Sequence, residues 1–97
     1  MQIEVRGFKQ VETYASDRIK VYRDKNTIYV TVNGQWTNLS TEAILATTTL
    51  KPKGNQVVMA HPSISTNKVG FATDGQIRYF GTTGTVSIYT SFYLPIA

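Results

Sequence analysis

The fold is decided by one stretch, Val69-Gly70-Phe71-Ala72-Thr73-Asp74-Gly75-Gln76-Ile77-Arg78-Tyr79-Phe80, which has the pattern of two short strands joined by an Asp-Gly turn. A two-residue loop would place Phe71 opposite Arg78 and divide the apolar side chains between the two faces of the sheet. A three-residue loop, with the glycine in a left-handed conformation, instead places Phe71 opposite Ile77 and Val69 opposite Tyr79. We expect the second arrangement, because it gathers the apolar side chains on one buried face.

The same reasoning extends to the next strand, across the loop Gly81-Thr82-Thr83-Gly84. If this loop is a four-residue hairpin, Ile77 lies opposite Ile88 and Tyr79 lies opposite Val86. The reverse face would then show two polar rows, which we list as Gly70, Arg78 and Ser87 in the first and Ala72, Gln76 and Tyr89 in the second. The sequence thus predicts a buried face and a polar face, each three strands wide.

The remaining chain also has the pattern of short strands separated by turns. The segments 19–23 and 26–36 predict a hairpin around Asp24-Lys25, with Val21 opposite Ile28 and Ile19 opposite Val30, and with a turn or a bulge at Asn33-Gly34. Further strands are expected at 43–50, 56–61 and 85–94, and 62–67 is expected to be the longest polar connection. This spacing predicts an all-β fold, a small antiparallel β-barrel or β-sandwich of six to eight short strands.

Composition supports a strand-rich single domain. The chain has 97 residues, fourteen of them threonine and eleven aromatic, and it contains no cysteine. We expect residues 1–18 to be an N-terminal arm or linker, with a short strand near Ile3 to Val5, and residues 19–97 to be a β head domain. There is no apolar run of the length that a membrane-spanning helix needs, so no membrane span is expected.

The net charge of +4 could suit nucleic acid or an anionic cell-wall polymer, or it could belong to an ordinary solvated surface. Nucleic-acid binding finds some support in Lys68-Val69-Gly70-Phe71-Ala72, which has the basic-glycine-aromatic pattern of sheets that stack bases. The expected register buries Phe71 and Tyr79, however, and leaves Arg78 and Tyr89 on the open face. An OB-like single-stranded nucleic-acid-binding module is therefore the less favoured alternative.

Catalysis has little support in the sequence. His61 is the only histidine, and it precedes a proline at a strand end, a position typical of a surface or packing residue. The carboxylates Glu42 and Asp74 stand apart from each other, whereas a glycosidase needs two carboxylates in one site. We therefore expect no enzyme, no cofactor and no metal site.

The order of the features resembles the C-terminal head domains of bacteriophage baseplate and tail-fibre receptor-binding proteins from phages of Gram-positive hosts. The resemblance covers roughly 19–97 and depends on the strand ending near Trp36, on 44–54 with its leucine-proline-glycine loop, on Thr73-Asp74-Gly75 and on the terminal Ser-Ile-Tyr strand. Relatives often have a fuller Leu-Pro-x-Gly-Tyr-x-Pro loop, whereas here Lys51 separates Leu50 from Pro52. The resemblance implies a homotrimer in the virion tail tip or baseplate that binds a cell-wall or envelope saccharide of a bacterial host.

Saccharide recognition requires an aromatic face and planar polar groups, and these residue types provide the candidate ligand-binding residues Trp36, His61, Gln76, Arg78 and Tyr89. Tryptophan at a strand end is also typical of a lid on the core. Arg78 and Tyr89 could equally form a subunit interface, where arginine and tyrosine are enriched. The main alternative function is a structural baseplate or tail module that binds only other virion proteins.

Overall fold

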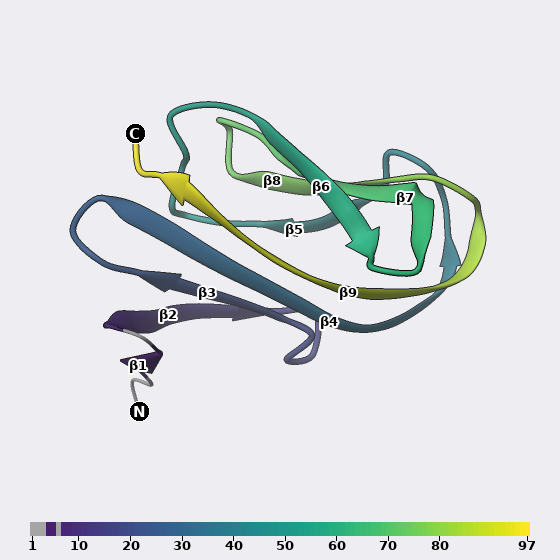
Figure 1. Ribbon diagram of the computed structural model, residues 1–97, viewed down its shortest axis with the longest axis horizontal. Helices are drawn as coiled ribbons and strands as arrows, with labels where there is room; N and C mark the ends of the chain where they lie inside the picture. Colours follow the sequence, from purple (N-terminus) through teal and green to yellow (C-terminus); the bar gives the residue numbers. More distant parts are fainter. Residues whose placement is uncertain (1–3, 6) are drawn as a thin grey trace.

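The computed structural model describes residues 4–5 and 7–97, whose strands form two antiparallel sheets packed face to face (Figure 1). The first sheet has the order β1-β2-β3-β4-β9, with β1 at Glu4–Val5, β2 at Phe8–Tyr14, β3 at Ile19–Arg23, β4 at Thr27–Leu39 and β9 at Gly84–Pro95. The second sheet has the order β5-β8-β7-β6, with β5 at Ile44–Thr47, β6 at Gln56–His61, β7 at Ile64–Phe71 and β8 at Gln76–Phe80. The predicted all-β class is confirmed, in the form of a sandwich.

The hydrophobic core lies between the two sheets. Alternate residues of β3, β4 and β9 point inward and are almost completely buried, as are those of β7 and β8. Most of their outward neighbours are partly or fully exposed, which is the pattern of antiparallel sheets with one solvated face, and Tyr22 and Gly70 are the buried exceptions. On one side of the sandwich β6 contacts β9, so an edge of the second sheet lies beside an edge of the first.

The predicted hairpin at 69–80 is confirmed in detail. Phe71 pairs with Ile77 and Val69 with Tyr79. Gly75 has a φ of 90° and its N–H donates to the carbonyl of Ala72 at 2.9 Å, which closes the three-residue loop. Ile77 is fully buried while Arg78, its neighbour, is half-buried on the outer face. The register that sorts apolar from polar side chains is therefore the one that the turn specifies.

The expected pairing of β8 with the last strand is wrong. Ile88 pairs with Gly34 and Val86 with Trp36, so β9 belongs to the first sheet. The loop at 81–83 directs the chain across the sandwich, because Asn67 Oδ1 accepts from Thr82 N at 3.1 Å and Tyr79 Oη donates to the carbonyl of Thr82 at 2.6 Å. Since β5 and β7 already occupy the two edges of β8, no edge of β8 is left for β9.

The hairpin of β3 and β4 has the predicted faces but a register that differs by two residues. Val21 pairs with Val30 rather than Ile28, and Ile19 pairs with Val32 rather than Val30. The turn is longer than expected, because Asp24 Oδ1 accepts hydrogen bonds from the N–H groups of Asn26 and Thr27, at 2.9 and 2.8 Å. A shift of two preserves the side-chain alternation, so the buried residues are the expected ones.

Two expected connections are strands. The segment 8–14, expected to be part of an arm, forms β2 and pairs with β3, and most of the expected polar connection at 62–67 is the start of β7. A bulge at Val11 changes which face of the sheet the β2 side chains occupy. Beyond the bulge the carboxylate of Glu12 reaches the connection between β5 and β6, accepting from Thr49 N at 3.3 Å and from Thr49 Oγ1. The expected short strand near Ile3 to Val5 lies partly outside the described residues.

Candidate functional site

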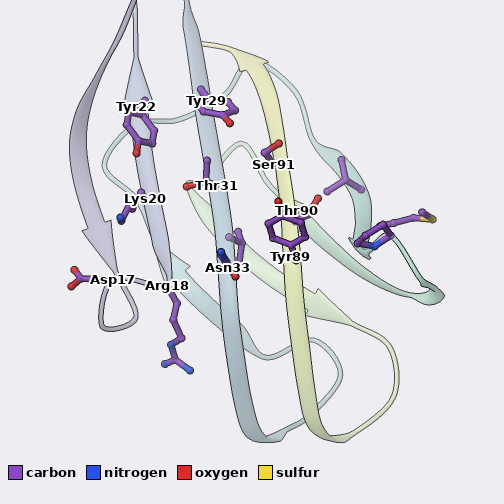
Figure 2. Close-up of a pocket in the computed structure, with 14 residues that line it drawn as sticks. Asp17, Arg18, Lys20, Tyr22, Tyr29, Thr31, Asn33, Tyr89, Thr90 and Ser91 are labelled. Carbon is purple, nitrogen blue, oxygen red and sulfur yellow. The ribbon is translucent and has the colours of Figure 1, made fainter. Parts of the chain in front are cut away.

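The outer face of the first sheet is hollowed into an open trough of about 890 Å³. In Figure 2 side chains from β3, β4 and β9 line its floor, with Tyr22 and Tyr29 at one end and Asp17 and Arg18 toward the other. Val58, Met59 and Pro62, from β6 and the turn that follows it, add an apolar border beyond β9. The volume falls within the range of small-molecule and cofactor pockets in proteins.

The floor of the trough consists of cross-strand rows that the sheet register fixes. The first row is aromatic: Tyr22 and Tyr29 line the trough, and Tyr93, which pairs with Tyr29, continues the row on β9. The second row is polar and consists of Lys20, Thr31 and Ser91. In the third row Asn33 pairs with Tyr89, and its backbone N–H donates to the carbonyl of Arg18 at 2.8 Å. A polar strip therefore separates two aromatic positions.

The aromatic row is tightly packed. The ring centroids of Tyr29 and Tyr93 lie 4.6 Å apart in a stacked arrangement, and Tyr22 lies 5.5 Å from Tyr29. Phe8, from β2, lies 5.7 Å from both Tyr29 and Tyr93, although two strands separate β2 from β9 in the sheet. The sheet must curl for these rings to meet, which makes its outer face concave at this end.

Arg18 lies at the other end of the trough, where contacts with neighbouring residues fix its side chain. The guanidinium carbon of Arg18 lies 4.2 Å from the ring centroid of Trp36, and its Nη1 and Nε donate to the carbonyls of Gln35 and Ala15, both at 2.7 Å. The preceding loop has three consecutive non-glycine residues with positive φ, namely Ala15, Ser16 and Asp17. Such conformations are costly and persist where surrounding contacts impose them.

The structure separates the five candidate residues predicted from the sequence. Tyr89 lies in the trough with 60% of its surface exposed. Trp36 is 9% exposed and packs in the core beneath Arg18. Gln76 and Arg78 lie together on the outer face of the second sheet, where Arg78 Nη2 donates to Gln76 Oε1 at 2.6 Å. His61 ends β6, and its Nδ1 accepts from the N–H of Ser63 at 3.1 Å.

Other residues of the trough, above all Lys20, Tyr29 and Asn33, were not predicted as ligand-binding residues. The signal that could have found them is the alternation of 19–36, which places Lys20 and Tyr29 on the face opposite to Val21 and Ile28. What the sequence lacked was the pairing of β4 with β9, which brings Tyr89 beside Asn33. The predicted polar face across 69–94 is therefore wrong, because Ser87 and Tyr89 belong to the first sheet while Gly70, Gln76 and Arg78 belong to the second.

The described residues include no group of three His, Asp or Glu side chains that could hold a metal ion. No helix long and apolar enough to cross a membrane occurs in the same part of the chain. Comparison with protein-family models, curated proteins and solved structures finds no match. The residues of the trough therefore carry the functional inference.

Proposed function

We propose that this protein is a non-catalytic host-recognition domain of a bacteriophage tail or baseplate, and that its trough binds a saccharide of the bacterial cell surface. The observation that carries the proposal is the exposed ring of Tyr89 beside a strip of hydroxyl, amide and ammonium groups. A tyrosine ring offers an apolar face to the C–H groups of a sugar, and its hydroxyl remains available for hydrogen bonding. The polar strip supplies partners for the sugar hydroxyls.

The dimensions of the trough favour an extended ligand. Tyr29 and Asn33 are four residues apart on β4, and Asn33 pairs with Tyr89, so at roughly 3.3 Å per residue the rows of Tyr29 and Tyr89 lie about 13 Å apart. Thr31 and Ser91 fall between the two aromatic positions. A ligand that reaches both positions is longer than one sugar ring, as in a polysaccharide chain.

The charges of the trough argue against single-stranded nucleic acid as its ligand. A groove that binds single strands follows the phosphate backbone with several cations. Lys20 is the cation of the trough floor, while Arg18 is held by Trp36 and two carbonyls and Asp17 adds a negative charge. A largely neutral floor with exposed aromatic and hydroxyl groups suits a saccharide better.

In this proposal the protein acts as a homotrimer on a virion tail. An open trough gives modest affinity for one saccharide, and several copies on one particle raise the overall avidity without tighter individual contacts. The mass of the protein in solution measures the copy number directly. Three copies support the trimer, and a monomer at high concentration contradicts it.

The binding test titrates the Tyr89→Ala and Tyr89→Phe variants with purified fragments of cell-wall polysaccharide. Calorimetry measures the dissociation constant of each. Loss of the ring in Tyr89→Ala is expected to weaken binding about tenfold, equivalent to about 1.4 kcal/mol. Tyr89→Phe keeps the ring and is expected to retain most of the affinity. Val57→Ala, on the outer face of the second sheet, is the control and should bind like the unchanged protein, since Val57 is 55% exposed and lies outside the trough.

A second arm measures binding of the isolated protein to host cells, with purified wall polysaccharide as competitor. Competed binding supports host recognition. A structural module that contacts only other virion proteins shows no binding to cells. Binding of single-stranded DNA that falls in Tyr89→Ala while the polysaccharide has no effect would instead favour the nucleic-acid alternative.

A further inference from the structure

The positive charge of the protein is concentrated at one end of the sandwich, away from the polar floor of the trough. Five of the Lys and Arg residues in the described part of the chain lie there, contributed by three separate segments. We call this group the basic end, and it consists of Lys9, Arg23, Lys25, Lys51 and Lys53. The acidic residues at this end are Asp24 and Asp74 in the adjoining turns and Glu4, which pairs with Lys9 across β1 and β2, so five cations outnumber three acidic residues.

Backbone contacts hold these segments together. The N–H of Ile96 donates to the carbonyl of Asn26 at 2.8 Å, and the N–H of Ala97 donates to the carbonyl of Lys51 at 2.9 Å. Lys53 N–H donates to the carbonyl of Pro95 at 2.9 Å, and Lys9 pairs with Arg23 across β2 and β3. In Figure 1 the turn between β3 and β4 and the connection between β5 and β6 lie at the left end, beside the C-terminal residues.

The carboxylates of the two turns accept hydrogen bonds within those turns. Asp24 Oδ1 accepts from the N–H groups of Asn26 and Thr27, and Asp74 Oδ1 accepts from Gln76 N–H at 2.9 Å. The four lysines are exposed, and none forms an ion pair or a side-chain hydrogen bond with a described residue. Their ammonium groups are therefore open to solvent and to an external anion.

We propose that the basic end binds successive phosphate groups of a linear polyanion. Lysine ammonium groups on exposed turns act as point charges, which suits phosphate oxygens. The cations come from several turns around an end of the sandwich, so they match a row of charges better than one small anion. The driving force is release of the counterions condensed on the polymer, and binding through this surface is strongly salt-dependent.

The test measures binding of fluorescently labelled inorganic polyphosphate to Lys25→Ala/Lys53→Ala by anisotropy, over a series of salt concentrations. The unchanged protein is expected to bind at about 50 mM salt and to lose affinity steeply by about 200 mM. Removing two contacts is expected to weaken binding about tenfold and to reduce the slope of log affinity against log salt by about 1.4. Both lysines are exposed, so the variant should keep the unfolding midpoint of the unchanged protein.

The matched control is Lys68→Ala, which is compared with the single variant Lys53→Ala. Lys68 is an exposed lysine of β7 outside the basic end. The Lys68→Ala variant should leave the salt slope unchanged, and an equal loss in the two single variants would overturn the proposal by showing that only net charge matters. Absence of polyphosphate binding at low salt would overturn it as well. Poly(glycerol phosphate) and oligothymidine identify the source of the phosphates: similar slopes support recognition of phosphate alone, and markedly tighter binding of oligothymidine would contradict it.

Discussion

Arg18 lies over the ring of Trp36, with its guanidinium carbon 4.2 Å from the ring centroid, and this contact joins the β2–β3 connection to β4. The side chain also covers Gly34, because a Cβ at that position would overlap Arg18 Cγ. Glycine is therefore the residue that lets the arginine cross β4 on its way to the indole. The contact fixes one end of the trough.

We expect Arg18→Ala to lower the free energy of unfolding by about 1 to 3 kcal/mol, because it removes the cation–π contact and two hydrogen bonds to carbonyls. Urea unfolding followed by fluorescence measures the change, since Trp36 is the only tryptophan. Arg18→Lys keeps the charge without the planar guanidinium group, so its free energy of unfolding should lie between those of Arg18→Ala and the unchanged protein. An Arg18→Ala protein with unchanged stability and emission would refute the role assigned to this contact.

Gly75→Ala is expected to destabilise the protein by about 2 kcal/mol or more. Gly75 has a φ of 90°, which alanine adopts at a cost, and an added Cβ would lie 2.5 Å from the carbonyl oxygen of Thr48. Gly54→Ala is the matched control, because a Cβ there meets open space, and its effect should stay within about 0.5 kcal/mol. Equal midpoints of thermal unfolding for the two variants would contradict the importance of the loop.

Tyr14 gives the stability a dependence on alkaline pH. Burial, with a smaller contribution from the hydrogen bond to Glu12, raises the pKa of Tyr14 from 10.0 to about 12. The unfolded chain loses this proton first, so the contribution of neutral Tyr14 to the unfolding free energy is present below pH 10 and is lost as the pH rises through about 12. Denaturant unfolding of Tyr14→Phe should therefore show a shallower decline over this interval, and parallel declines in the two proteins would exclude the linkage.

Local turn chemistry explains which parts of the fold could be predicted from the sequence. The register of β7 against β8 follows from the glycine of a three-residue loop, and alternation along each strand identifies the buried face. The partner of β9 could not be predicted in this way, because the path of the loop depends on contacts of Thr82 with Tyr79 and with Asn67, and Asn67 lies 15 residues away along the chain. Glycines at both ends of the loop 81–84 are compatible with a hairpin and equally with a crossover to the facing sheet.

The wrong partner for β9 affected the prediction of the candidate site more than that of the fold. Tyr89 and Arg78 were expected on one face of one sheet. They lie on the outer faces of different sheets, because β8 and β9 belong to different sheets. Val11 is a second example, since the bulge there brings Phe8 to the aromatic row while nothing in the alternation of 8–14 distinguishes the extra residue. Functional surfaces made by non-neighbouring strands need the topology before they can be assigned.

The long ladder between β4 and β9 also governs how the domain responds to a pulling force. The two strands pair from Thr27 with Pro95 to Leu39 with Gly84. Tension applied to the chain at Ile96 acts along the axis of β9, perpendicular to its interstrand hydrogen bonds, so these bonds bear the load together in shear rather than opening one after another. A domain with this ladder is therefore suited to resisting tension along β9.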